Sequence, residues 1–132
     1  MKLIDTNIIM YAIGKVHPLK EPCREVFQKV THGETDANID VEVLQEILYV
    51  YSSRGERAKG IKVIEEMLVI FSAPFVIGRA EIERAKDLMK KYAILTARDA
   101  IHCAIAINHN LEGIVSTDKD LDIVTEITCF KP

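Results

Sequence analysis

The feature that most constrains the fold is the regular alternation of short apolar segments with longer amphipathic ones. The short segments with the character of buried strands are Lys2–Ile4, Asp36–Ile39, Ala73–Ile77, Gly113–Ser116 and Thr128–Phe130. Helical patterns cover Thr6–Ile13, Pro18–His32, Val41–Ser53, Glu56–Phe71, Arg79–Tyr92 and Ala100–Ile107. Asp40, directly before the third of these, is a good N-cap. Strands that alternate with helices form a mainly parallel sheet covered on both faces. The sequence therefore predicts an α/β fold, a three-layer α/β/α sandwich with a mainly parallel central sheet of roughly four to five strands.

The composition is that of one ordinary globular domain, which we expect to span residues 1–132. Of the 132 residues, 48% are hydrophobic and 28% are charged, and the net charge of −3 argues against a strongly basic nucleic-acid binder. Cys23, Cys103 and Cys129 form no CxxC pair, as expected for free thiols in a reducing cytoplasm. The chain shows no signal-peptide pattern and no apolar run near the roughly 20 residues of a membrane span. We therefore expect a cytoplasmic location and no membrane contact.

A carboxylate follows the first expected strand without any spacer. Lys2–Ile4 runs directly into Asp5, Thr6 and Asn7. In parallel α/β sheets, ligands bind beyond the carboxyl ends of the strands, and Asp5 stands at such an end. Taken alone, Asp5 is equally well explained as the N-cap of the helix that begins at Thr6.

Three more carboxylates occupy comparable positions. Glu46 lies in the helix after the second strand, Asp99 opens the apolar helix, and Asp118 follows the strand Gly113–Ser116. Each has a simple alternative: a solvated glutamate, a favourable charge at a helix N-terminus, and an ordinary acidic loop. If the strands are neighbours, however, all four acids meet at one end of the sheet, where a divalent cation such as Mg²⁺ or Mn²⁺ relieves their repulsion.

Four stretches occur in a recognisable order: LIDTNIIM, VLQEIL, ARDAIHCAIA and VSTDKDLD. Together they resemble the signature blocks of the PIN domain, a family that includes the VapC toxins of prokaryotic toxin–antitoxin pairs. The resemblance covers Met1 to about Val124, and the first and third blocks are the most specific. One departure is Leu121, where many relatives have an aromatic residue, and this affects packing more than chemistry.

The resemblance also implies roles for individual residues. It implies metal binding by Asp5, Asp99 and Asp118, with Glu46 as the fourth catalytic acid. Supporting residues around these ligands would be Thr6, Asn7 and Ser116, which hold Asp5, and Asp120, which joins the metal shell in some states.

The activity that the resemblance implies is that of an Mg²⁺- or Mn²⁺-dependent endoribonuclease, in which metal-activated water hydrolyses an RNA phosphodiester. The implied partners are RNA, a second copy of the chain in a homodimer, and an antitoxin whose segment enters the acidic groove. The alternative is a catalytically silent PIN-fold module that binds RNA or protein. Receiver-type phosphoacceptors need an acidic pair near the first strand, and haloacid-dehalogenase-like phosphatases need an aspartate where Asn7 stands.

Basic residues near the acidic positions are candidates for contacts with RNA phosphates. Arg54 and Arg57 lie in a basic stretch with Lys59 and Lys62, for which a solvated helix surface is the simpler interpretation. Arg98, directly before Asp99, contacts either substrate or a neighbouring helix. We expect His102, one turn after Asp99, to serve the core through a hydrogen bond rather than the site.

Overall fold

The centre of the molecule is a four-stranded parallel sheet with strand order β2-β1-β3-β4. The computed structural model describes residues 1–132. The strands are short: β1 spans Lys2–Ile4, β2 Ala37–Asn38, β3 Gly113–Val115 and β4 Cys129–Phe130. Within β1, Leu3 is paired with Ile114 of β3 and Ile4 with Val115. Strand β1 is therefore internal, and residue 5 leaves the sheet at its centre.

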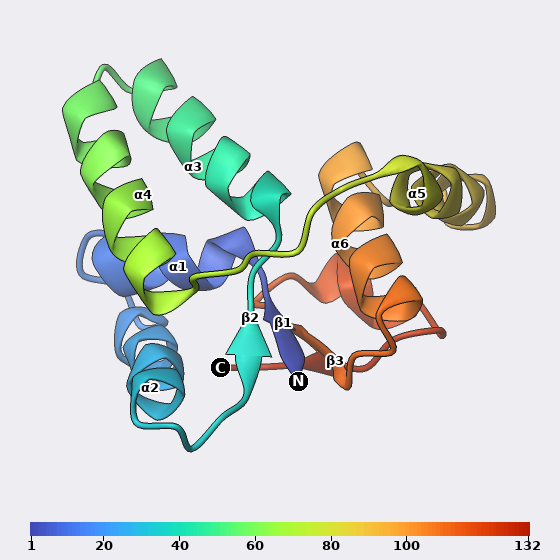
Figure 1. The fold of residues 1–132 in the computed structure, drawn as a ribbon, viewed down its shortest axis with the longest axis horizontal. Helices are drawn as coiled ribbons and strands as arrows, with labels where there is room; N and C mark the ends of the chain where they lie inside the picture. Colours follow the sequence, from blue (N-terminus) through green and yellow to red (C-terminus); the bar gives the residue numbers. More distant parts are fainter.

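Four helices cover one face of the sheet (Figure 1). They are α1 (Thr6–Ile13), α2 (Lys20–Thr31), α3 (Val41–Ser53) and α4 (Arg57–Ile70). Successive side chains of a strand point to opposite faces, so Ile4 and Val115 contribute to this core together with Ile47 and Tyr51 of α3. The side chains of Leu3 and Ile114 enter the opposite core.

The opposite face is covered by α5 (Arg79–Lys91) and α6 (Ala97–Asn108), followed after β3 by the short 3₁₀ segment η1 (Lys119–Ile123). Helix α6 is apolar on nearly all sides because it lies between the sheet and α5, and Ala100 and Ile105 are fully buried. Leu121 of η1 is also fully buried in this core. None of the helices has the length and the apolar sequence needed to cross a membrane.

The fold class is confirmed, and most elements lie within two residues of their predicted bounds. The prediction of a strand over Ala73–Ile77 is wrong. The structure has only an isolated bridge there, between Phe75 and Asp40, formed by hydrogen bonds from Val41 N to Phe75 O (3.0 Å) and from Phe75 N to Ile39 O (2.9 Å). Pro74 has no N–H to donate, so the pairing cannot extend as a regular ladder in that direction.

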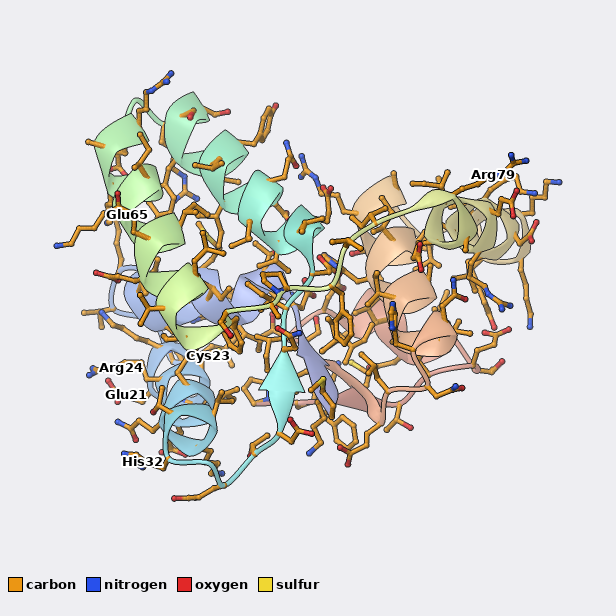
Figure 2. The ribbon with its side chains drawn as sticks, in the orientation of Figure 1. Glu21, Cys23, Arg24, His32, Glu65 and Arg79 are labelled. Atoms are coloured by element: carbon orange, nitrogen blue, oxygen red, sulfur yellow. The ribbon has the colours of Figure 1, made fainter.

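Charged pairs on the helices lie at the margins of the molecule. Glu21 and Arg24 form an i,i+3 pair of 3.1 Å on α2, and Arg79 lies on α5 at the opposite margin (Figure 2). Exposed pairs of this kind contribute about 0–1 kcal/mol each. The charges that distinguish this protein are instead those gathered at the carboxyl ends of the strands, where α3 and α6 begin on either side of the sheet (Figure 1).

Candidate functional site: an acidic cleft at the carboxyl ends of the strands

Asp5 is held in place by a small network of hydrogen bonds. Its backbone N–H donates to Val115 O (3.0 Å), which continues the β1–β3 pairing by one residue. Its Oδ2 accepts hydrogen bonds from Ser116 Oγ (2.6 Å) and from Asn7 Nδ2 (2.8 Å). The side chain is 7% exposed, and Oδ1 makes no hydrogen bond, so this oxygen remains available to a ligand.

The same network fixes the loop that carries Asp118. Asn7 Oδ1 accepts from Thr117 N (3.1 Å), and Ser116 Oγ accepts from Asp118 N (3.0 Å). Asp118 Oδ1 in turn accepts from Asp120 N (2.8 Å), which starts η1. The loop after β3 is therefore tied by side chains to Asp5 and to the first turn of α1.

Thr6 differs from its expected role. Its hydroxyl is buried and has no hydrogen-bond partner, so it does not hold Asp5. Within this group, Asn7 and Ser116 provide the contacts that orient the Asp5 carboxylate. Asp5 caps α1 only by position, because its side chain accepts no N–H from that helix.

Asp99 reaches the cleft from the first turn of α6. Thr96 caps this helix by accepting the Asp99 N–H at its Oγ1 (3.2 Å). Burial raises the pKa of the Asp99 carboxyl above its ordinary value, and the nearby charges of Asp5 and Asp118 raise it further. A carboxylate disfavoured in this way is stabilised by any cation that enters the cleft.

Glu46 lies on α3 on the other side of the cleft and is paired with an arginine from α6. Arg98 Nη1 lies 3.4 Å from Glu46 Oε1, and Arg98 Nε lies 3.7 Å from Glu42 Oε1. The guanidinium also lies over the ring of Tyr49, 5.3 Å from its centroid. Of the two roles predicted for Arg98, contact with a neighbouring helix is therefore confirmed. Its side chain also lines the cleft.

All four acids line one cleft of about 440 Å³, together with Thr6, Asn7 and residues 96–98. No three of the acidic side chains are drawn together closely enough to chelate an ion by themselves. Mg²⁺ is commonly bound through one or two carboxylates and keeps several water ligands, so a closed cage is not required. The free Oδ1 of Asp5 and the half-buried carboxylate of Asp99 are the hard oxygen donors that suit Mg²⁺ or Mn²⁺.

A second, larger cleft of about 660 Å³ adjoins the acidic one and shares Thr6, Asn7 and Glu46 with it. It runs between α1, α3 and the start of α4. Of the basic residues predicted to contact RNA, Arg54 and Lys59 line it, together with Lys15 and His17. Arg57 and Lys62 are exposed and line neither of these clefts.

The sequence did not single out Asp40 as part of the site region beyond its predicted role as the N-cap of α3. That role is confirmed, since Asp40 Oδ1 accepts from Val43 N (3.0 Å). Its other oxygen contacts His102 Nδ1 at 2.6 Å, inside the protein. The hydrogen bond expected of His102 is thus present, but no local pattern could reveal a partner that lies 62 residues earlier in the chain.

Comparison with known proteins places this arrangement in a family. The sequence model of the PIN domain matches residues 2–127. The chain belongs to the PIN domain family. Ribonuclease VapC13 of Mycobacterium tuberculosis is 31% identical over 122 residues, covering 92% of this chain and 93% of that protein. The resemblance to PIN domains seen in the four sequence blocks is thereby confirmed.

Solved structures show the same PIN fold at lower sequence identity. VapBC2 from Rickettsia felis, crystallised with a DNA fragment from its promoter, aligns with a TM-score of 0.77 at 17% identity, covering 99% of this chain and 98% of that one. FitAcB from Neisseria gonorrhoeae aligns with a TM-score of 0.77 at 15% identity, covering 98% and 96%. At such identities the likeness concerns the fold, so the chemistry must be argued from the cleft of this PIN domain.

Proposed function

We propose that this protein is a divalent-metal-dependent endoribonuclease, the toxin of a VapBC-type toxin–antitoxin pair. The observation that carries the proposal is the gathering of Asp5, Glu46, Asp99 and Asp118 in one cleft of a PIN domain. The relative VapC13 is named a ribonuclease, which supports the same reaction class here. A silent interaction module is less well supported, because nothing in the cleft replaces or blocks the four acids.

In this proposal, Asp5, Asp99 and Asp118 surround Mg²⁺ or Mn²⁺ and hold it in part through the water ligands that the cation keeps. When bound, the cation lowers the pKa of water and stabilises negative charge on the phosphoryl group. Ser116 and Asn7 occupy Oδ2 of Asp5 and so direct Oδ1 to the ligand. Asn7 and Ser116 also accept hydrogen bonds from Thr117 N and Asp118 N in the loop after β3. The positions of Asp5 and Asp118 are therefore coupled.

Glu46 and Arg98 act at the opposite wall of the cleft. The negative charge of a phosphodiester competes with Glu46 for the Arg98 guanidinium. The Arg98–Glu46 pair, 3.4 Å apart and partly exposed, is weak enough for the phosphate to replace Glu46. Arg98 then contacts the phosphate, and the released Glu46 carboxylate accepts a hydrogen bond from the attacking water. Hydrolysis adds the hydroxyl of water to phosphorus and transfers its remaining proton to the leaving oxygen.

The neighbouring cleft provides the path for the rest of the RNA strand. Its basic residues Arg54 and Lys59 offset the repulsion between an acidic site and a polyanion. We assign Arg57 only a longer-range electrostatic contribution, because it lines neither cleft. Charge reversal at Arg54 is therefore expected to reduce RNA affinity and its salt dependence more than charge reversal at Arg57.

The partner protein in this proposal is an antitoxin that reaches the acidic cleft with a basic side chain. An arginine can pair with two carboxylate oxygens at once, so it competes directly with a cation for Asp5 and Asp99. The neighbouring structure from Rickettsia felis is a VapBC complex, which supports a partner of this kind. We also propose a homodimer, and analytical ultracentrifugation of the purified chain tests it.

The first experiment is a Mn²⁺ titration by calorimetry, because it requires no knowledge of the RNA sequence. We expect the wild type to bind and Asp99→Asn to weaken binding about tenfold, or about 1.4 kcal/mol. The matched control is Asp87→Asn, the same chemical change at an exposed position of α5 where the partner is Lys86. A folded wild type that binds no Mn²⁺, alone or with a phosphodiester present, contradicts the metal-dependent reaction.

The second experiment is RNA cleavage, with the same variants. Asp5→Asn and Asp99→Asn are expected to abolish cleavage while circular dichroism and thermal unfolding show that the fold is retained. Cleavage at the wild-type rate in either purified variant refutes the site assignment. Metal binding without any cleavage of varied RNA pools favours the silent interaction module.

A further inference from the structure

A buried histidine stands between two carboxylates beneath the acidic cleft. His102 lies on α6, one turn after Asp99, and is 1% exposed. Its Nδ1 lies 2.6 Å from Asp40 Oδ2, and its Nε2 lies 3.7 Å from Asp5 Oδ1. Asp40 is fully buried, so the carboxylate, the imidazole and the second carboxylate form a line inside the protein.

The short contact to Asp40 determines where the ring carries hydrogen at one end. A lone pair on Nδ1 would face a carboxylate oxygen at 2.6 Å, which is unfavourable. Nδ1 therefore carries hydrogen and donates it to Asp40. Burial lowers the pKa of His102, but Asp40, through its charge and its hydrogen bond, and Asp5 and Glu46, through their charges, raise it overall to about 9. Nε2 has no hydrogen-bond partner, and Asp5 Oδ1 lies 3.7 Å from it.

Asp40 connects this line to the other wall of the cleft. While Oδ2 contacts His102, Oδ1 accepts the N–H of Val43 and caps α3. Helix α3 carries Glu46, and α6 carries Asp99 and His102. One carboxylate thus fixes the start of α3 to the second turn of α6, and the ring that it holds lies beside Asp5, the residue directly after β1.

We propose that Asp40 and His102 are a positioning pair, which fixes α3 against α6 and holds the imidazole ring beside Asp5, so that the acidic side chains keep their arrangement before a cation binds. The inference rests on the proposed function, since it concerns the same site. The distance of 3.7 Å is too long for a hydrogen bond, so the lone pairs of Asp5 Oδ1 remain free. His102 is therefore a positioning residue that acts through Asp5.

The test is a set of substitutions that breaks and then restores the link. In His102→Gln the side-chain amide must donate to Asp40, so its carbonyl oxygen faces Asp5 Oδ1 and two acceptors oppose each other. In the double variant Asp40→Asn with His102→Gln, the asparagine amide donates to the glutamine carbonyl, and the glutamine amide donates to Asp5. The asparagine oxygen still accepts Val43 N–H, so the cap of α3 is kept.

Mn²⁺ affinity is measured by calorimetry on each folded variant, with thermal unfolding to confirm the folded fraction. Losing a residue that orients a metal ligand commonly costs 10–100-fold in metal affinity, so we expect His102→Gln to weaken binding about tenfold. The double variant is expected to return to within about threefold of the wild type. The control is His109→Gln, which changes an exposed histidine directly after the same helix, away from the acidic cleft.

The outcomes separate this inference from the proposed function. If the wild type binds Mn²⁺ and Asp99→Asn weakens it, but His102→Gln binds like the wild type, the positioning pair is refuted and the metal site stands. Affinity that rises in both the single and the double variant is also a refutation, because it identifies His102 as a simple opposing charge. A wild type that binds no Mn²⁺ removes the proposed function and this inference with it.

Ring ¹⁵N chemical shifts of His102 provide a readout that does not depend on metal. The sequence contains four histidines, and His102 is the buried one, so its resonances can be assigned by comparison with His102→Gln. We expect Nδ1 of His102 to carry hydrogen and to exchange it slowly, because this hydrogen lies in the short, buried hydrogen bond to Asp40. An Nδ1 without hydrogen contradicts the link.

Discussion

Ser116 offers the sharpest single test of how the cleft is built. Its hydroxyl is fully buried, donates to Asp5 Oδ2 at 2.6 Å, and accepts from both Asn7 Nδ2 and Asp118 N at 3.0 Å. Ser116→Ala removes one oxygen and no other atom of the cleft. Asp5 then keeps a single donor, Asn7, and the turn that carries Asp118 loses the acceptor that fixes its first N–H.

Two magnitudes follow from these contacts. A hydrogen bond to a charged group contributes about 1.5–3 kcal/mol, and a partly exposed backbone N–H such as that of Asp118 can bind water instead. We therefore expect Ser116→Ala to lower the free energy of unfolding by about 2 kcal/mol. Because Asp5 also loses part of its orientation, the Mn²⁺ affinity is expected to fall about tenfold.

The assays are urea unfolding and Mn²⁺ calorimetry on the same preparations. Ser53→Ala is the matched control: its hydroxyl also makes one short bond, to Tyr49 O at 2.8 Å, but it is exposed on α3. A surface change of this kind is expected to stay within about 0.5 kcal/mol. If Ser116→Ala loses stability but binds Mn²⁺ like the wild type, the hydroxyl supports the fold alone and the reasoning about Asp5 is refuted.

Three further predictions concern the scaffold around the site. Glu81 accepts the N–H of Gly78 at the start of α5, and this bond lowers the pKa of the Glu81 carboxyl. The stability that the cap contributes is therefore present above the ordinary pKa of glutamate and is lost as the pH falls through the lower folded value. Unfolding of the wild type and of Glu81→Gln, compared across pH 2–7, checks this. Burial raises the pKa of Cys103 to about 12, so iodoacetamide at pH 8 is expected to alkylate Cys103 only after denaturation, as read by mass spectrometry. A Cβ at Gly60 would lie 2.7 Å from Tyr51 Cβ. Overpacking of this kind costs about 1–3 kcal/mol, and alanine gains about 1 kcal/mol over glycine in helix propensity. Gly60→Ala is therefore expected to lower the free energy of unfolding, measured in urea, by about 1 kcal/mol.

The sequence predicted best what depends on local chemistry. The bounds of α3 were predicted as Val41–Ser53, because Asp40 is a strong N-cap and apolar residues recur at helical spacing behind it. The wrong strand over Ala73–Ile77 shows the limit of the same approach. Its apolar residues match a strand, but Pro74 and the two-residue length of β2 allow only one bridge to form.

In the candidate site, too, local sequence patterns indicate some features and not others. Three of its acids could be predicted to meet because each follows a strand or opens a helix at one end of a parallel sheet. The partners of Asp5 could be named only through the resemblance to PIN domains, which implied Ser116, Asn7 and Thr6, and the structure shows hydrogen bonds from the first two. Ser116 lies 111 residues from Asp5, and nothing near Asp5 in the sequence indicates that Ser116 rather than Thr6 would supply the hydroxyl.

The cations around the cleft explain how a protein of net charge −3 can keep so many acids together. Arg98 lines the cleft and pairs with Glu42 and Glu46, whereas His102 lies inside the protein between Asp5 and Asp40. The two cations differ in exposure, because the Arg98 side chain is 41% exposed and that of His102 is 1% exposed. The exposed cation can exchange its carboxylates for a phosphate at little cost, whereas the buried one cannot leave without stranding a charge. In the proposed function, Arg98 can therefore turn from Glu46 to a phosphate while Asp40 and His102 keep their positions.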